Sequence, residues 1–166
     1  PYTLAIVLAQ QLGLARAARQ AAILGTDISR PMIEQAEHGV YYQQRLQQVP
    51  EAVRRQFFKP VGLGQWRIIP ELQQFTVFRR FNLMSSTWPF KNRFHVIFCR
   101  NVFYYFDHPH RRQLTEQLFR VTEPGGWLLT SVTESLRTYQ SGWIMVTPGI
   151  YRKPVSNIEN GRGMHQ

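Results

Sequence analysis

At the start of the chain, the spacing of hydrophobic residues is typical of a helix, then of a strand, then of a helix again. Leucines recur at intervals of four over residues 1–12 and predict a helix. A basic linker is expected over residues 13–21, followed by an apolar run over residues 22–28 that is typical of a buried parallel strand. Ser29 is expected to cap a second helix that runs to His38. The order helix, strand, helix is typical of an α/β fold.

The pattern changes in the middle of the chain, where glutamine, arginine and aromatic residues become frequent. A helix is expected over residues 51–57 and a turn over residues 62–64. Residues 66–69 and 75–81 have the composition of strands, and the second of them alternates in character. We interpret about residues 41–81 as a small antiparallel β insertion within the α/β fold.

The α/β alternation resumes in the last part of the chain. Residues 94–99 are the clearest buried strand, and Asp107 can cap a helix that runs to residue 121. A sharp Pro-Gly-Gly turn is expected before another strand over residues 127–132. Residues 143–152 predict a closing hairpin, and residues 154–166 a polar tail.

Composition and charge narrow the class of protein. Hydrophobic residues make up 43% of the 166 residues and aromatic residues 13%, as in a folded domain. The formal net charge is +10, and residues 51–100 hold 9 basic against 2 acidic side chains, which favours an acidic partner. The single cysteine, Cys99, excludes a disulfide framework and a cysteine zinc site, and we expect no metal. Without a membrane-length apolar run or a signal sequence, a cytoplasmic location without membrane insertion is expected.

Candidate ligand-binding residues follow the strands of the α/β part, because ligands of open α/β sheets bind beyond the carboxyl ends of strands. Asp27 follows the first predicted strand, where a carboxylate can accept both hydroxyls of a ribose or can serve as a turn acid. Asn82 and Leu83 follow the basic strand and could contact an adenine edge, although an ordinary loop explains them as well when they are taken alone.

The third candidate is the segment 100–107, where polar groups stand beside aromatic rings. Such a strand end suits a cationic, partly apolar ligand, because aromatic faces attract cations. The alternative is an aromatic core cluster that ends in a helix cap. Phe103 and Phe106 fit that alternative, whereas Asn101 and Tyr105 are harder to explain by it.

These motifs, taken in order, resemble one family. Residues 94–102, followed by Tyr105-Phe106-Asp107, are similar to the signature of the bacterial chemotaxis-receptor methyltransferases, the CheR family. The resemblance covers roughly residues 1–153, and this string is its specific part. Weaker matches in the same order are residues 25–28, 81–83, 124–129, 134–136 and 149–153.

The resemblance implies a Rossmann-like methyltransferase sheet that binds S-adenosylmethionine and methylates receptor glutamates, releasing S-adenosylhomocysteine. The substrate would be a methyl-accepting chemotaxis receptor, an acidic helical bundle. By this likeness Asp27 would hold the ribose, Asn82 and Leu83 would frame the adenine, Asn101 and Val102 would line the cofactor, and Tyr105 would lie near the transferred methyl group. The insertion corresponds to the family's receptor-docking subdomain, with Gly62, Gly64, Trp66, Arg67 and Arg79 as candidate docking residues.

Two departures from the family pattern affect these expectations. The family's glycine-rich cofactor loop and first strand should lie just before Pro1, so residues 1–153 are expected to form a partial catalytic domain that is weak or inactive by itself. In addition, residues 131–134 read Ser-Val-Thr-Glu where the family commonly shows Gly-His-Ser-Glu.

Two other classes of function compete with the enzyme. One is a non-catalytic methyltransferase-like module that docks acidic receptor or partner proteins. The other is nucleic-acid binding, since basic strands that carry aromatic residues can stack bases. We do not expect a nucleic-acid partner, because the charge is concentrated on an insertion and no nucleic-acid motif is present.

Overall fold

The protein forms two compact units that are joined in sequence between Leu83 and Met84. The structure is a computed structural model and describes residues 1–139 and 141–155. Within these residues, no helix combines the length and the apolar character needed to cross a membrane.

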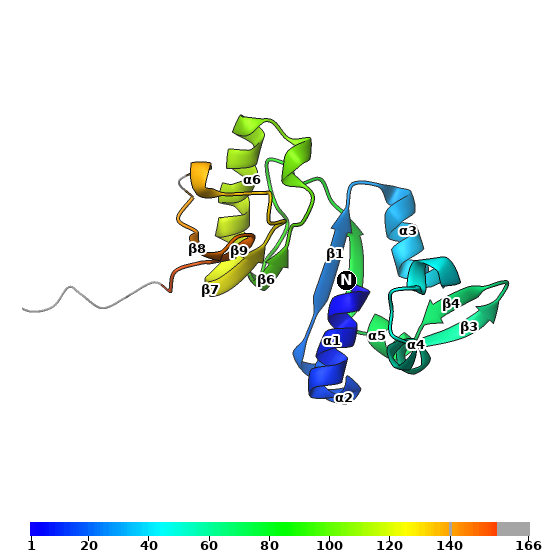
Figure 1. Cartoon of the computed structure of the whole chain (residues 1–166). Coiled ribbons are helices and arrows are strands. Elements are labelled where there is room, and N and C mark those ends of the chain that lie inside the picture. The colour runs from blue at the N-terminus through cyan, green and yellow to red at the C-terminus, as the bar shows by residue number, and fades with distance from the viewer. Residues whose placement is uncertain (140, 156–166) are drawn as a thin grey trace, which may run out of the picture. The chain divides into compact units, whose positions relative to one another are not determined.

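The first unit contains a pair of parallel strands with helices packed against it (Figure 1). Its α/β elements are α1 (Tyr2–Leu12), α2 (Leu14–Gln20), β1 (Ile23–Asp27), α3 (Arg30–His38) and β5 (Thr76–Arg80). Strand β1 pairs with β5 from Ile23 opposite Thr76 to Asp27 opposite Arg80. The predicted helix, strand, helix order is therefore confirmed.

The predicted linker over residues 13–21 is wrong, because most of it forms α2. This short helix buries Ala17 completely and packs Leu14 and Ala18 against the core of the unit. Apolar residues on one side of α2 thus pack it against the core. The arginines on its other positions led to the prediction of a linker. Gly25 on β1 leaves room for Pro1 and Phe78, because a Cβ there would lie 2.6 Å from Pro1 Cγ and 2.7 Å from Phe78 Cδ1.

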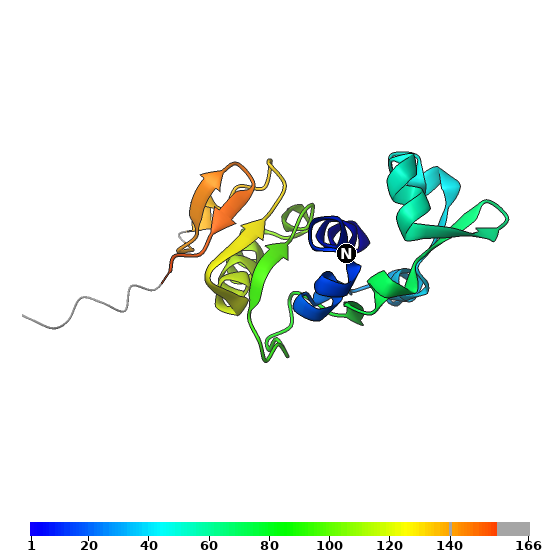
Figure 2. The ribbon, with the colours of Figure 1, turned by 90° about the horizontal axis from the view of Figure 1, so that it is seen from below.

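A three-stranded antiparallel sheet with the order β2-β4-β3 is inserted between α3 and β5. Its elements are β2 (Val40–Tyr42), a 3₁₀ helix (Gln43–Leu46), α4 (Glu51–Phe57), β3 (Phe58–Gly62), β4 (Gln65–Ile68) and α5 (Pro70–Gln73). Figure 2 shows the β3–β4 hairpin projecting from this part of the unit with α4 beside it. The helix over residues 51–57 and the turn at Leu63-Gly64 agree with the sequence prediction.

The predicted insertion extends too far, because its last strand belongs to the parallel pair. Strand β5 hydrogen-bonds to β1 and not to the antiparallel sheet. Thr76 and Phe78 are buried on β5, and Tyr2 of α1 lies edge-on to the Phe78 ring at 5.3 Å. The alternation of apolar and polar residues along 75–81 indicates a strand with one covered face. Strands of parallel and of antiparallel sheets can both have this pattern, so it does not identify the partner strand.

A single cluster of buried side chains connects both parts of this unit. It joins α1, the parallel pair, α4 and β4, so the insertion is packed on the same core as the α/β part. Its members are Tyr2, Ala5, Ile6, Ala9, Ala17, Ile23, Ile33, Leu46, Phe57, Phe58, Ile68, Ile69, Leu72, Phe75 and Phe78.

The second unit is a four-stranded sheet with the order β6-β7-β9-β8. Its elements are β6 (Phe94–Phe98), the 3₁₀ helix η2 (Phe103–Tyr105), α6 (His108–Val121), β7 (Thr122–Leu129), η3 (Arg137–Tyr139), β8 (Ile144–Thr147) and β9 (Ile150–Arg152). Strands β6 and β7 are parallel, and β8 and β9 form the predicted antiparallel hairpin. Helix α6 lies along one face of the sheet and buries Leu114 and Leu118 (Figures 1 and 2).

The predicted turn before residue 127 is wrong, because β7 runs through the Pro-Gly-Gly sequence. The glycines instead permit a bulge, and the β6–β7 register shifts between Phe94 and Val96. A Cβ on Gly126 would lie 2.9 Å from the carbonyl oxygens of Glu123 and His95. The strand ends at Leu129 and not at residue 132.

Strand β6 occurs as predicted, but the prediction that it is buried is wrong. Val96 is 44% exposed and Phe98 is 52% exposed. The strand lies at the end of the sheet and pairs only with β7 among the described residues. The apolar run therefore identified the strand but not the exposure of its side chains.

Candidate functional site

The first group of candidate residues lies at the carboxyl edge of β1 and β5. Because these strands are parallel, Asp27 and the segment after Arg80 reach the same edge of the sheet. The Phe81 amide donates a hydrogen bond of 2.9 Å to the Asp27 carbonyl oxygen. The structure therefore places Asp27 at the same edge of the sheet as the segment that continues into Asn82 and Leu83.

The exposed Asp27 carboxylate already closes a tight turn. Its Oδ1 accepts a hydrogen bond of 2.8 Å from the Ser29 amide, and Arg80 Nε donates to the Ile28 carbonyl at 2.9 Å. Ser29 stands at the predicted start of α3, but its side chain makes no capping bond, which corrects that detail. A carboxylate offers about four acceptor positions, so a turn acid keeps capacity for ligand hydroxyls.

The second group of candidate residues lies at the carboxyl edge of β6 and β7. These strands are also parallel, and the Cys99 amide donates to the Leu129 carbonyl at 2.8 Å. The loop that holds Asn101, Val102 and Tyr105 thus leaves the sheet next to the loop that follows β7. Asn101 has a left-handed backbone with φ of 58°, a conformation that asparagine tolerates better than most residues.

Glu134 ties these two loops together, and the sequence prediction did not name it as a site residue. Its side chain is buried, and Oε1 accepts from the Phe103 amide at 2.9 Å. Oε2 accepts from the Asn101 and Ser131 amides, each at 3.0 Å. Its place in the family-like string 134–136 was the signal that could have found it, together with its position after a strand.

The carboxylate form of Glu134 is stabilised by its donors. Burial alone would raise its pKa, but hydrogen bonds from Ser131, Asn101 and Phe103 outweigh burial and lower the pKa below its ordinary value. Burial and the Glu134 charge raise the pKa of the nearby Cys99 thiol to about 12. Cys99 is buried and therefore inert near neutral pH, as its place in an apolar strand predicted.

Ser131 links the Asn101 backbone to the Asn101 side chain. Its hydroxyl oxygen accepts from the Asn101 amide at 3.0 Å, and its hydroxyl donates to Asn101 Oδ1 at 2.5 Å. This serine lies in the Ser-Val-Thr-Glu segment that departs from the family pattern. The departure therefore supplies contacts to a candidate cofactor residue and is more than a change in packing.

The aromatic residues of the loop divide into core and surface. Phe103 is buried, as expected of a core residue, and Arg111 Nε donates to its carbonyl oxygen at 2.8 Å. Tyr105 is 74% exposed, and its hydroxyl oxygen accepts a hydrogen bond of 3.2 Å from Tyr104. That bond raises the pKa of Tyr104. The loop ends where Asp107 caps α6 by accepting from the His110 amide at 3.0 Å, as predicted.

The candidate docking residues do not all belong to the antiparallel sheet. Gly62 and Gly64 flank the β3–β4 turn with positive φ, and Trp66 and Arg67 lie on β4. Arg79 instead lies on β5 of the parallel pair, where it donates to the Phe78 carbonyl at 2.6 Å. The first four residues share one hairpin, and Arg79 is outside it.

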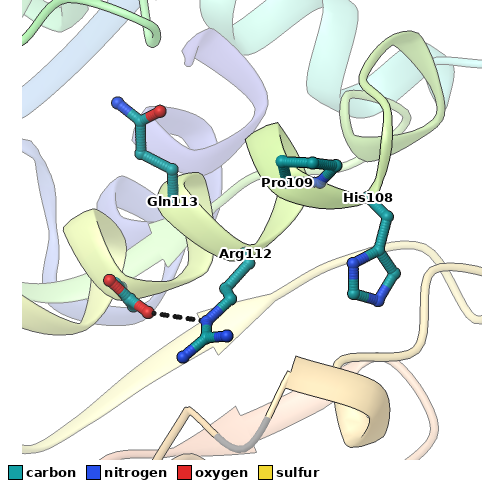
Figure 3. Close-up of a pocket in the computed structure, with 5 residues that line it drawn as sticks. His108, Pro109, Arg112 and Gln113 are labelled. Carbon is teal, nitrogen blue, oxygen red and sulfur yellow. Dashed lines mark hydrogen bonds and ion pairs between the residues drawn. The ribbon is translucent and has the colours of Figure 1, made fainter.

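A surface hollow beside the first turns of α6 contains none of the candidate residues. Figure 3 shows that Arg112 and Gln113 point away from one another there, and that Arg112 pairs with Glu116 at 3.2 Å. The hollow is lined by His108, Pro109, Arg112, Gln113 and Glu116, all from one helix. Side chains that diverge from one element do not form a ligand site, so we do not assign one there.

Comparison with known proteins decides the family. A family model described as CheR methyltransferase, SAM binding domain, matches residues 1–149. The chain belongs to the CheR methyltransferase family. This match confirms the resemblance found in the sequence, and it covers residues 1–149 of the roughly 153 expected.

Curated CheR relatives match over most of the chain. It is 33% identical to chemotaxis protein methyltransferase 2 of Pseudomonas aeruginosa over 81% of this chain and 49% of that protein. It is 29% identical to the chemotaxis protein methyltransferase of Borreliella burgdorferi over 92% of this chain and 54% of that protein. The chain thus spans about half the length of the curated relatives it matches.

The solved structures add little to this assignment. The crystal structure of the cyclase SpnF aligns with 77% of this chain and 43% of its own, with a TM-score of 0.42 and 16% sequence identity. The CheR family match, with the parallel strand pairs and the antiparallel insertion, agrees with the predicted α/β methyltransferase fold.

Proposed function

We propose that this chain contributes to the transfer of a methyl group from S-adenosylmethionine to glutamate side chains of methyl-accepting chemotaxis receptors in the cytoplasm. The match to the CheR SAM binding domain over residues 1–149 carries this proposal. The arrangement of the candidate residues supports it, since they follow the carboxyl ends of parallel strands within each unit.

The donor and acceptor chemistry of these residues fits the cofactor. Asp27 would accept ribose hydroxyls, with Asn82 and Leu83 beside the adenine. Asn101 and Val102 would contact the cofactor from their loop, and the exposed Tyr105 would contact the reacting groups. The Asp27 carboxylate has acceptor capacity beyond its turn bond, and the Asn101 side chain carries an amide that can donate.

The reaction needs alignment rather than acid–base catalysis. A substrate glutamate has an ordinary pKa of about 4.3 and is already ionised near neutral pH. Its oxygen forms a bond to the sulfonium methyl carbon while the carbon–sulfur bond breaks and its electron pair stays on sulfur. The protein therefore has to align the groups and exclude water, which agrees with the lack of an identifiable acid–base pair in the sequence.

Receptor docking is proposed for the β2-β4-β3 sheet. Arg67 is exposed on β4, and Arg54 of α4 lies over the Trp66 ring at 5.1 Å. Leu63 at the hairpin tip is 96% exposed. A basic surface with an apolar tip suits an acidic helical bundle that offers charge and some apolar contact.

Cofactor affinity tests the proposed function. Calorimetry should compare this chain with a form extended upstream to the length of the curated relatives. We expect the extended form to bind S-adenosylmethionine and this chain to bind it far more weakly, because the family's glycine-rich loop would complete the site. Asp27→Asn in the extended form should weaken binding by roughly tenfold, as the loss of a charged hydrogen-bond acceptor does.

Glu34→Gln is the matched control for Asp27→Asn, because it removes an exposed carboxylate that pairs with Arg30 on α3. It should leave the affinity unchanged. Equal affinities of the short and extended forms would contradict an incomplete site, and absence of binding by both would contradict the proposed function.

The second candidate function is a docking module without catalysis. The observation that favours it is the exposed basic hairpin of the β2-β4-β3 sheet, where Arg67 is exposed and Leu63 is 96% exposed. A Tyr105→Phe variant of the extended form that loses methyl transfer but keeps receptor binding would favour the enzyme.

A further inference from the structure

We propose that Glu134 is a positioning residue that fixes the Asn101 loop and so directs the Asn101 side-chain amide toward the cofactor. The inference rests on the proposed function, because Glu134 contacts the loop that holds Asn101, a proposed cofactor residue. Three backbone N–H groups converge on the buried Glu134 carboxylate, two of them from this loop.

The backbone of the loop depends on this carboxylate. Asn101 has positive φ, a conformation that persists when surrounding contacts determine it. Glu134 Oε2 binds the Asn101 amide and Oε1 binds the Phe103 amide, so one side chain fixes both neighbours of Val102. The path of the chain toward Tyr105 therefore starts from a point that Glu134 holds.

The Asn101 side chain is oriented through Ser131. Glu134 Oε2 accepts from the Ser131 amide, and the Ser131 hydroxyl oxygen accepts from the Asn101 amide. The single hydroxyl proton of Ser131 is then donated to Asn101 Oδ1. Because Oδ1 faces Ser131, the Asn101 NH₂ group is the part of the amide that can donate to a ligand. A hydroxyl, carboxylate or ring-nitrogen acceptor of the cofactor fits this donor.

A neutral amide cannot replace the carboxylate. Glutamine has one acceptor oxygen and one NH₂ group, so it would set a donor against either Phe103 or the pair formed by Asn101 and Ser131. The Glu134→Gln variant therefore keeps the volume of the side chain but loses at least one of the hydrogen bonds that fix the loop. The titratable groups that respond to the Glu134 charge are Cys99 and Tyr104.

NMR shifts of amide protons report the hydrogen bonds between Glu134 and the Asn101 loop when no cofactor is bound. In the wild-type chain we expect the Asn101, Phe103 and Ser131 amide proton shifts to titrate together in acid, with a midpoint below that of an ordinary glutamate. Cys99 and Tyr104 do not interfere, because burial raises the pKa of Cys99 to about 12 and a hydrogen bond raises that of Tyr104 above 10.0. In Glu134→Gln this shared titration should disappear.

Cofactor affinity measures the consequence for binding, in the extended form used above. Glu134→Gln should weaken S-adenosylmethionine binding about tenfold, and Ser131→Ala about threefold to tenfold, as loss of one hydrogen bond does. Glu116→Gln is the matched control, because it removes a partly exposed carboxylate of α6 that pairs with Arg112 and Arg120. It should bind like the wild type.

The outcomes separate this inference from the proposed function. Wild-type affinity in Glu134→Gln, or in Ser131→Ala if Glu134→Gln does not fold, would overturn the positioning role while leaving the proposed function in place. A titration of the three amides that survives in Glu134→Gln would also overturn it. Absence of cofactor binding by the extended wild type would overturn the proposed function, and this inference with it.

Discussion

At the scale of single residues, the stability of the second unit is tied to pH through Glu134. Burial would raise its pKa, but its hydrogen bonds outweigh burial, and its pKa in the folded state lies below its ordinary value. A lowered pKa means that the carboxylate contributes its full stabilisation above the unfolded-state pKa. That contribution is lost as the pH falls through the folded-state pKa.

We therefore predict that acid destabilises the wild-type chain more than the Glu134→Gln variant. As the pH falls from the unfolded-state pKa through the folded-state pKa of Glu134, the wild type should lose more of its free energy of unfolding than the variant does. Urea unfolding followed over a series of pH values measures this difference. Glu116→Gln should keep the wild-type dependence, and parallel curves for the wild type and Glu134→Gln would contradict the prediction.

Residue-scale prediction from the sequence found polar residues at the ends of strands, and it missed a side chain that holds one of these residues from another loop. Asp27 ends β1, and Asn82 and Asn101 follow β5 and β6, which a pattern of apolar runs reveals. Glu134 follows β7 by several residues, and its role depends on hydrogen bonds between segments about thirty residues apart. The string 134–136 and its place after a strand could have drawn attention to Glu134, but no local pattern shows which amides its carboxylate binds.

At the scale of elements, the β6–β7 pair depends on a close approach of two backbones. Replacing Gly126 with alanine would place a Cβ 2.7 Å from Thr122 Cγ2 and 2.9 Å from two carbonyl oxygens. Because backbone atoms have little freedom to move, we expect Gly126→Ala to destabilise the chain by roughly 1–3 kcal/mol. Thermal and urea unfolding measure this loss.

Pro124→Ala provides the comparison for this prediction, since Pro124 is exposed on the same strand. It should change stability by less than the glycine substitution does. If both variants unfold like the wild type, then the close approach of β6 and β7 relaxes without cost and the prediction is wrong.

The element-scale errors have a common cause. Strand β5 was assigned to the wrong sheet, and β6 was expected to be buried, although both strands were found in the sequence. Periodicity reports which side chains share a face, whereas the choice of partner strand is made by contacts distant in sequence. Helix α2 was missed for a related reason, because its single buried alanine is a weak signal.

At the scale of the whole molecule, charge should govern receptor recognition. We predict that Arg67→Glu weakens binding to the acidic helical bundle of a chemotaxis receptor by about tenfold at low ionic strength, because it places like charges opposite one another. Arg120→Glu on α6 makes the same change in net charge outside the proposed docking sheet. Binding measured at two salt concentrations should separate the two variants.

Equal losses of affinity for Arg67→Glu and Arg120→Glu would show that only net charge matters, and the proposed docking surface would then be wrong. A loss confined to Arg67→Glu that fades at high salt would support it.

Most of the fold class was accessible from the sequence, and the family was accessible from one string. The helix and strand order, the closing hairpin and the Asp107 cap are set by local patterns, and the structure has them. The division into two units at Leu83 was not predicted, because it depends on which strands pair and not on composition. The proposed assignment of residues to the cofactor rests on family likeness, beyond what local geometry supplies.

The edge position of β6 has a consequence for handling the protein in solution. Val96 and Phe98 are exposed on a strand that pairs on one side only in the described sheet, which is a surface prone to joining another chain. The formal charge of +10 opposes such joining, since like molecules repel one another. Salt shortens the reach of that repulsion to about 8–10 Å near physiological ionic strength. Dilute buffers should therefore keep the protein monodisperse, and concentrated salt should precipitate it.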